Sequence, residues 1–180
     1  MNNREDRFIQ YLIDLGKKKD RGPLAALRHS LAFEPGQYLK ALPLVEPFVS
    51  KEWHAQDSRR LALYAVAGLY AKHPKHKQDT ALSAAFGEFQ RDRRNEGRSN
   101  SLERRFIALL EADDGAVLDH LRQVIALLAS VDMGLDYRQL LHDLNTWLNP
   151  QSPNLDKTKQ RWARDFYIAS LSSDEEITTN

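Results

Sequence analysis

The chain has 180 residues, with 26 lysines and arginines against 25 acids, so its net charge is +1. This length suits one compact domain or two small packed halves, and it is enough for a hydrophobic core. The near-zero charge excludes a polycation, so any contact with nucleic acid must come from a local patch. The lack of cysteine excludes disulfides and cysteine-ligated zinc.

The N-terminus and the hydropathy pattern indicate where the protein works. Residues 1–7 carry charged side chains from the start, which is unlike a secretory signal peptide. No apolar run approaches the roughly 20 residues that a membrane-spanning helix needs. We therefore expect a cytoplasmic protein that does not contact a membrane.

Apolar residues follow helical spacing through the first half of the chain. A first helix is predicted around residues 8–13, and Gly22-Pro23 is predicted to open a second, since proline is tolerated at the first helical position. Prolines at 35, 43 and 47 then divide the chain into short turns. Asp57 is predicted to cap a long helix. After a polar, basic loop over 73–79, a further helix follows from residue 82 to 89.

The second half continues the pattern. Asn100, with Glu103 three residues later, reads as a capping box that opens a helix. The clearest apolar stripe runs through Val117, Leu121, Val124 and Leu128. Asp136 is predicted to cap another helix, and a last helix is expected from Leu155 to Ala169.

No window shows sustained period-two alternation, so the sequence predicts an all-α fold of about eight or nine helices without a sheet. We expect two packed helical bundles, residues 1–94 and 95–171, that meet at the loop over residues 95–100. Residues 172–180 are polar and acidic, and we expect this tail to be disordered because it has little apolar surface to bury.

The segment from Phe89 to Arg105 carries the strongest local charge. It holds six arginines against three acids, a surplus of three, whereas the whole chain has a surplus of one. These arginines are Arg91, Arg93, Arg94, Arg98, Arg104 and Arg105. Guanidinium groups make planar, two-pronged contacts with phosphate or carboxylate, which favours a specific partner over a diffuse solvated charge. We predict that this segment meets the partner.

Helical geometry places two of these arginines outside the core. At 100° per residue, Leu102, Phe106 and Leu109 define the buried face of their helix. Arg104 then points away from the core and Arg105 lies on the flank. The sequence therefore predicts that Arg104 in particular is available to a partner.

Further basic residues occur on other helices. Arg122 lies on the flank of its helix, and Lys157, Arg161 and Arg164 fall at i, i+4 and i+7 of the last helix. A line of cations can follow a phosphate backbone. An exposed basic stripe is nevertheless more often only a solvated helix face, with nearby acids such as Asp165 pairing locally.

Arg28 poses a separate question, because it sits beside Leu24 and Leu31 on what we expect to be the inner flank of its helix. Burying an unpaired charge is costly. Arg28 is therefore expected either to pair with a carboxylate or to reach a partner across an interface, and the sequence leaves both open.

The sequence offers little support for an enzyme. His73, His76 and Asp79 have a loosely metal-like spacing, but the surrounding lysines would oppose a cation. No metalloprotease motif, glycine-rich phosphate loop or nucleophile elbow is present. We therefore expect no catalytic residues, no metal site, no cofactor and no small-molecule substrate. Trp147 and Trp162 fit core positions, whereas Trp53 is the one tryptophan that suits a surface role.

Several short blocks together resemble one family. They are Arg21-Gly-Pro-Leu-Ala-Ala-Leu-Arg28, Gly97-Arg98, Glu103-Arg-Arg-Phe-Ile-Ala-Leu-Leu110, Leu121-Arg122-Gln-Val, Leu135-Asp136-Tyr137 and Arg161-Trp-Ala-Arg-Asp-Phe166. Their order and spacing, from about Arg21 to Phe166, resemble the small subunit of the type I-E CRISPR Cascade complex, usually called CasB. The loop over residues 72–77 and the acidic tail have no counterpart in this pattern.

The resemblance implies an all-α, non-catalytic subunit, present as two copies in an RNA-guided surveillance complex. Such a subunit would contact other Cascade subunits, the guide RNA, and the target and displaced DNA strands, and so stabilise the R-loop. The family's basic contacts correspond here to Arg28, Arg98, Arg104, Arg105, Arg122 and Arg138. Two other interpretations remain open. One is a protein-binding helical scaffold whose arginines pair with acidic partner surfaces. The other is a helical nuclease that uses the histidine loop.

Overall fold

The all-α prediction is confirmed. The structure, a computed structural model, describes residues 3–96 and 99–171, and these form nine α-helices and four 3-10 turns with no strand. The α-helices are α1 (Arg4–Lys18), α2 (Arg21–His29), α3 (Leu42–Val45), α4 (Ser58–Lys72), α5 (Leu82–Arg93), α6 (Ser99–Glu111), α7 (Val117–Ser130), α8 (Tyr137–Trp147) and α9 (Leu155–Ser170). The 3-10 turns are η1 (Ser30–Ala32), η2 (Leu39–Ala41), η3 (Glu46–Phe48) and η4 (Arg94–Glu96).

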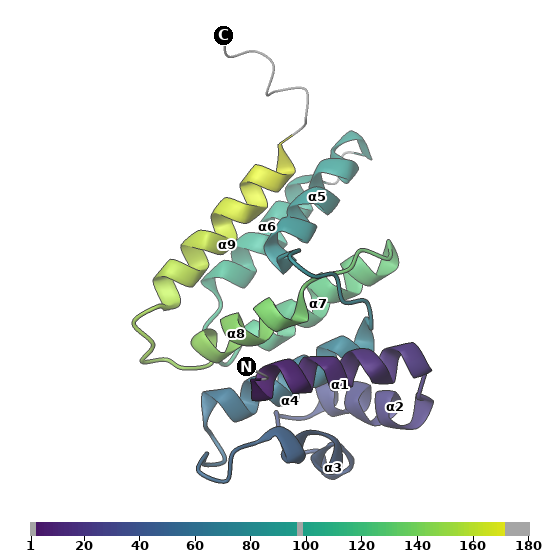
Figure 1. The fold of residues 1–180 in the computed structure, drawn as a ribbon. Helices are drawn as coiled ribbons and strands as arrows, with labels where there is room; N and C mark the ends of the chain where they lie inside the picture. Colours follow the sequence, from purple (N-terminus) through teal and green to yellow (C-terminus); the bar gives the residue numbers. More distant parts are fainter. Residues whose placement is uncertain (1–2, 97–98, 172–180) are drawn as a thin grey trace.

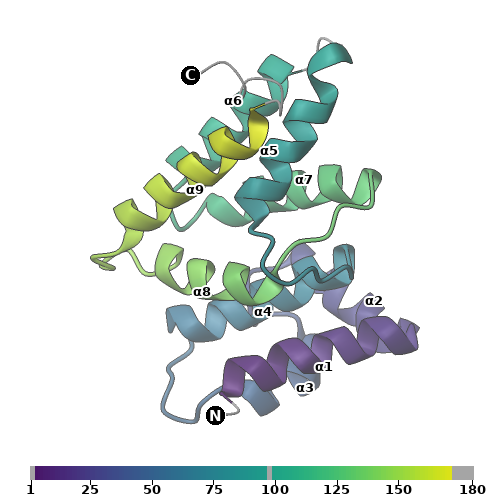
Figure 2. The same ribbon diagram turned by 45° about the horizontal axis from the view of Figure 1, so that its top comes forward.

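The helices are arranged in three levels. Figures 1 and 2 show α5, α6 and α9 at one end of the molecule, α1 to α4 at the other, and α7 and α8 between them. Helix pairs interlock across the predicted boundary at residue 94, because α5 packs closely on α9 and α4 packs on α8. One hydrophobic cluster includes residues from both ends. This packing does not test whether residues 1–94 and 95–171 are separate bundles, so that division stays a prediction.

Helix α4 is the most enclosed element. Residues 62–71 are buried on every side, because alanines and Gly68 let neighbouring helices approach closely. A Cβ at Gly68 would lie 2.6 Å from Leu31 Cδ2, so α2 and η1 sit directly on this helix. The carboxylate of Asp57 accepts the backbone N–H of Arg59, which confirms the predicted N-terminal cap.

The closest helix contact joins α5 and α9 at Gly87. A Cβ at this position would lie 2.3 Å from the carbonyl oxygen of Phe166. The rings of Phe86, Phe106 and Phe166 fill the space beside it, with the Phe106 and Phe166 centroids 3.9 Å apart and nearly parallel. Glycine at position 87 therefore sets the distance between the two helices.

Two loops between helices pair to form what we call the joint, residues 73–80 and 131–137. His76 and Leu135 form an isolated parallel bridge, and the backbone N–H of Lys77 donates to the Leu135 carbonyl at 2.9 Å. The polar loop that the sequence left without a role thus fastens the end of α4 to the start of α8.

The acidic residue at the joint has two tasks. One carboxylate oxygen of Asp136 accepts the backbone N–H groups of Arg138 and Gln139, which confirms the predicted cap of α8. Its other oxygen accepts the N–H of Asp79 at 2.9 Å. The same side chain therefore starts α8 and holds the facing loop.

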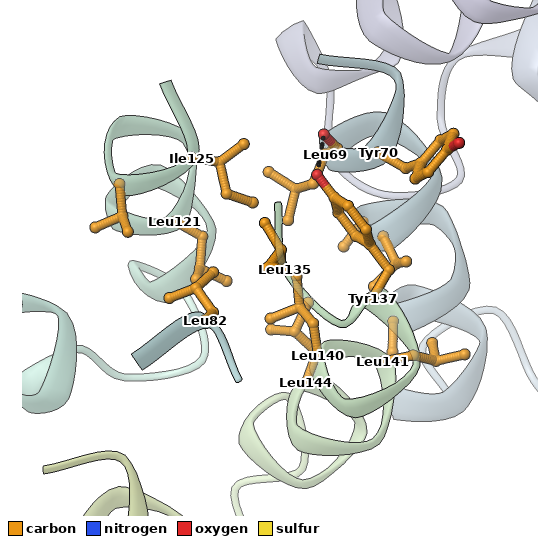
Figure 3. Packing of buried hydrophobic residues seen from close by; sticks show 14 of the residues in the cluster. Leu69, Tyr70, Leu82, Leu121, Ile125, Leu135, Tyr137, Leu140, Leu141 and Leu144 are labelled. Carbon is orange, nitrogen blue, oxygen red and sulfur yellow. Dashed lines mark hydrogen bonds between the residues drawn. The ribbon is translucent and has the colours of Figure 1, made fainter. Parts of the chain in front are cut away.

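The neighbouring Tyr137 is fully buried, and its hydroxyl donates to the His73 carbonyl at 2.6 Å. The Leu69 carbonyl lies 3.4 Å from the same hydroxyl. Figure 3 marks this contact with a dashed line. Both carbonyls belong to the C-terminal end of α4, and each also accepts a backbone N–H, from His73 and from Lys75. Tyr137 thus adds a hydrogen bond at the end of α4 that satisfies its own buried hydroxyl.

Two predicted helix starts are wrong by one or two residues. Helix α2 begins at Arg21, so Pro23 is its third residue, where the missing N–H still has no intrahelical partner. Helix α6 begins at Ser99, so Asn100 lies inside the first turn and is not the cap. The predicted tail over residues 172–180 lies outside the described residues. Among those that are described, no helix is both long and apolar enough to cross a membrane.

We predict that Gly87→Ala lowers the free energy of unfolding by about 1–3 kcal/mol, since the added methyl group must push α5 and α9 apart. Gly22→Ala is the matched control, because a Cβ there meets nothing within 4 Å. It should stabilise helix α2 by up to about 1 kcal/mol. Urea unfolding followed by circular dichroism measures both. Equal stability of Gly87→Ala and the wild type would contradict the close contact.

Candidate nucleic-acid interface

Three neighbouring side chains on α6 face three different directions. The carboxylate of Glu103 accepts the hydroxyl of Tyr167 on α9 at 2.9 Å, while Arg105 donates to Gln123 on α7 at 3.1 Å. Arg104 lies between them, so it points away from both neighbours and from the buried Phe106. Its exposure agrees with the prediction from helical geometry.

Arg122 continues the basic surface onto α7, beside the glutamine that Arg105 contacts. Its Nη1 lies 3.4 Å from a carboxylate oxygen of Asp119, and about a third of the side chain is exposed. Its Nε is buried and has no hydrogen-bond partner in the described part of the chain. Arg122 also lines a narrow cleft together with Phe33, so α7 faces the turn after α2.

Arg28 is exposed, and the prediction that it lies on the inner flank of its helix is wrong. Leu27 is the residue that α2 buries, while Leu24 and Leu31 are only half-buried, which turns Arg28 outward. Arg28 forms no ion pair with any residue in 3–96 or 99–171. We call the set Arg28, Arg104, Arg105 and Arg122 the arginine surface.

The predicted stripe on α9 divides into two kinds of residue. Lys157 and Arg164 are exposed, whereas Arg161 forms an ion pair with the buried Asp143 of α8. The other carboxylate oxygen of Asp143 accepts the indole N–H of Trp162 at 2.7 Å. Arg161 therefore anchors α9 to α8, and its guanidinium is already engaged.

The environment of Asp143 has opposing effects on its ionisation. Burial raises the pKa of Asp143 above its usual value, while the hydrogen bonds from Trp162 and Arg161 act in the opposite direction. Only 3 % of the Asp143 side chain is exposed, against 39 % for Arg161. Arg161 thus reaches water as well as its partner, whereas the carboxylate depends on the two donors.

Two predicted residues lie apart from this set. Arg138 on α8 pairs with Asp6 on α1 at 3.0 Å, which links the middle level to the first helix. Arg98 lies outside the described residues. The sequence did not indicate the pair between Arg138 and Asp6, since the two residues are far apart in the chain.

The tryptophans are placed as the sequence predicts. Trp147 and Trp162 are buried against each other, with ring centroids 5.1 Å apart. Trp53 is half-buried, and the guanidinium groups of Arg4 and Arg59 lie 5.3 and 4.6 Å from its ring centroid. The adjoining cavity has a volume of about 310 Å³. Sequence reasoning missed the two arginines, because neither is near Trp53 in helical spacing.

The histidine loop is engaged in backbone hydrogen bonds. His73 is buried, with Nε2 2.6 Å from the Met133 carbonyl, and His76 Nδ1 accepts the N–H of Tyr137 at 3.3 Å. Burial lowers the pKa of His76, which keeps it neutral and able to accept. Within residues 3–96 and 99–171, no three histidines and acids gather as metal ligands would.

Comparisons with known proteins agree on one family. The chain matches the family model described as CRISPR-associated protein Cse2 over residues 23–167. A CRISPR-associated protein Cse2 from Thermus thermophilus is 41% identical over 173 residues, which cover 94% of each protein. The crystal structure of M. ruber CasB is similar with a TM-score of 0.75 and 29% identity, covering 99% of this chain and 100% of that one.

A chain of a CRISPR RNA-guided surveillance complex also has the same fold. Its TM-score is 0.71 at 20% identity, and the match covers 92% of this chain and 94% of that one.

We predict that Arg161→Ala lowers the free energy of unfolding by about 1–3 kcal/mol at neutral pH and by less at acidic pH. Removing the guanidinium raises the folded-state pKa of Asp143 further above its unfolded value. A group with a raised folded pKa contributes most below its unfolded pKa and loses that contribution as pH rises through the folded one. The loss should therefore grow from about pH 4 to about pH 8.

Arg164→Ala is the control for this measurement, since Arg164 is on the same helix, exposed, and without an ion pair among the described residues. It should change stability by less than about 0.5 kcal/mol at every pH. A pH-independent loss for Arg161→Ala would show that the guanidinium does not control the ionisation of Asp143.

Proposed function

This chain belongs to the CRISPR-associated Cse2 family, also called CasB, and we propose that it binds nucleic acid as a non-catalytic part of an RNA-guided surveillance complex. Proteins of this family are subunits of the Cascade complex. The proposed role is to stabilise the guide RNA–target DNA R-loop and the displaced strand through basic surface patches. Its partners would be other Cascade subunits, a second copy of the chain, the guide RNA, and both DNA strands. It would act in the cytoplasm.

The observation that supports this proposal most is that most guanidinium groups of the arginine surface are exposed and have no carboxylate partner in the described part of the chain. Arg28 and Arg104 are exposed without an ion pair among the described residues, and Arg105 donates to the neutral amide of Gln123 and forms no ion pair within residues 3–96 and 99–171. An exposed, uncompensated guanidinium is free to bind a phosphate with two hydrogen bonds. The surface draws on α2, α6 and α7, so a strand would cross several elements.

Modest individual contacts suffice for such a role. R-loop formation exchanges DNA–DNA for RNA–DNA pairing at nearly equal free energy, so protein–backbone contacts can tip the balance. That principle is known for another RNA-guided effector, and we extend it here by analogy. A chain with a net charge of +1 would bind free DNA weakly. Held beside the R-loop by its neighbours, it would act at a high effective concentration.

The alternative function is a helical scaffold whose arginines pair with acidic partner surfaces. One observation favours it: the Arg138–Asp6 and Arg161–Asp143 pairs already use arginines to join helices inside this chain. The same chemistry would serve between subunits. The two functions differ in what is measured with DNA. If the arginines contact phosphates, the affinity for DNA falls as salt rises, whereas in the scaffold function replacing the arginines leaves DNA affinity unchanged.

We predict that the triple variant Arg98→Glu, Arg104→Glu, Arg105→Glu folds and assembles but weakens target-DNA binding by the reconstituted complex. The loss should shrink as salt rises, because each phosphate contact releases counterions. The slope of log affinity against log salt should fall by about 0.7–0.9 for each contact removed. Affinity for matched duplex at two ionic strengths measures both effects.

The control for this experiment is Lys17→Glu, Lys18→Glu, Lys19→Glu, at the exposed end of α1. It makes the same change in net charge at a site away from the arginine surface, so it should alter affinity much less. Unchanged affinity of the arginine variant at low salt would favour the scaffold function. Equal losses in both variants would indicate a general charge effect.

We also predict that the isolated protein cuts neither DNA nor RNA when Mg²⁺, Mn²⁺ or Zn²⁺ is added. His73 and His76 are held by backbone hydrogen bonds in the joint, so neither is positioned as a free base. A nuclease assay on labelled strands tests this. Cleavage that disappears on replacing His73 or His76 with alanine would overturn the non-catalytic assignment.

A further inference from the structure

Three aromatic rings cluster on the surface just after α2. The ring of His29 lies 5.8 Å from Phe33 and 4.9 Å from Tyr38, and Phe33 stacks on Tyr38 at 5.0 Å with 22° between the planes. His29 and Phe33 are exposed, Phe33 to the extent of 42 %. Phe33 belongs to a group of contacting rings, and contiguous exposed apolar side chains mark binding sites more often than single ones do.

The turn that follows α2 builds this cluster. Phe33 has an extended backbone after η1, and the backbone N–H of Gln37 donates to the Glu34 carbonyl at 3.0 Å, which closes a tight turn. Gly36 in that turn has φ +84°, a backbone conformation that residues other than glycine rarely adopt. The chain therefore folds back so that Tyr38 covers one face of Phe33 and holds the ring in place.

Two basic residues lie near the rings. Arg28 precedes His29 on α2 and is exposed, and Arg122 reaches the cleft that Phe33 lines. The cleft has a volume of only about 10 Å³, so no ring can enter it. A planar ligand would instead lie on the outer side of Phe33, and the phosphates of the same strand would continue toward these arginines.

We propose that His29, Phe33 and Tyr38 form a stacking platform for unpaired bases of a single-stranded nucleic acid. Aromatic side chains beside a basic track are how proteins hold single strands without reading their sequence. The bases of a duplex are already stacked on each other, so only an unpaired strand can use the rings. This inference rests on the proposed function and adds that bases, as well as phosphates, are contacted.

The test compares two labelled strands of the same charge. One is an oligothymidine of about 16 nucleotides, and the other is an abasic strand of equal length. Each is titrated with the full chain at low salt and followed by fluorescence anisotropy. The wild type should bind the strand with bases more tightly than the abasic strand. Phe33→Ala should lower the affinity for the strand with bases by about tenfold and leave the affinity for the abasic strand nearly unchanged. Phe33→Trp should retain the preference.

Leu39→Ala is the matched control, because Leu39 is nearby, 76 % exposed, and makes no ring contact with the cluster. It should affect neither strand. Thermal unfolding of each variant checks that the fold is kept. We expect Phe33→Ala to fold, because the Phe33 side chain is exposed.

The outcomes separate this inference from the function on which it rests. Equal binding of both strands by the wild type, lost on Arg104→Glu and Arg105→Glu, would overturn the platform and leave phosphate binding intact. Loss of complex assembly in Phe33→Ala with unchanged strand binding would make the rings a protein contact and overturn the platform. No binding of either strand up to the solubility limit would overturn the platform, whereas the proposed function is decided by the reconstituted complex, where the effective concentration is high.

Discussion

The hydroxyl of Tyr137 joins helix α8, in the middle level of the molecule, to the end of helix α4. It donates to the His73 carbonyl, and the Leu69 carbonyl lies close to it. Burial raises the pKa of Tyr137 far above its usual value, so the hydroxyl remains a donor at any physiological pH. Leaving this buried hydroxyl without an acceptor would cost about 1–3 kcal/mol. The hydrogen bond therefore helps to hold α8 in its place on α4.

The arginine surface draws on helices from both sides of the joint. Arg28 lies on α2, which packs on α4, whereas Arg104, Arg105 and Arg122 lie on α6 and α7 beyond the joint. Guanidinium groups on separate helices can follow one strand only if those helices keep a fixed relation. The paired loops of the joint and the packing of α7 on α4 and on α6 hold these helices together, as a preorganised surface requires.

The arginines fall into two groups with different physical roles. Arg138 and Arg161 are both engaged by carboxylates from other helices, but only the carboxylate that Arg161 engages is buried, so this pair is the one that holds two helices together. An exposed ion pair stabilises the fold by only about 0–1 kcal/mol. An exposed arginine with no such pair therefore contributes still less to the stability of the fold. Its value lies in what it can bind. This distinction supports Arg28 and Arg104 as contacts over Arg161.

Helical periodicity in the sequence was enough to predict the fold class, the capped starts of α4 and α8, and the outward direction of Arg104. These features depend on neighbours within a few residues. The Arg161–Asp143 pair and the exposure of Arg28 depend on how distant helices meet, so local spacing did not reveal them. The ring cluster was missed for a related reason, because its turn lies in an irregular segment after α2 where no periodic pattern applies.

The central claim is that the arginine surface touches nucleic acid inside the assembled complex. Replacing Arg104 with a photoreactive benzophenone amino acid places a cross-linker on the side of α6 that faces away from the core. The complex is assembled on matched target DNA and irradiated, with the same replacement at Lys18 as a control. The account predicts a covalent adduct with a nucleic-acid strand at position 104 and little or none at position 18. Adducts at position 104 that contain only protein would contradict it.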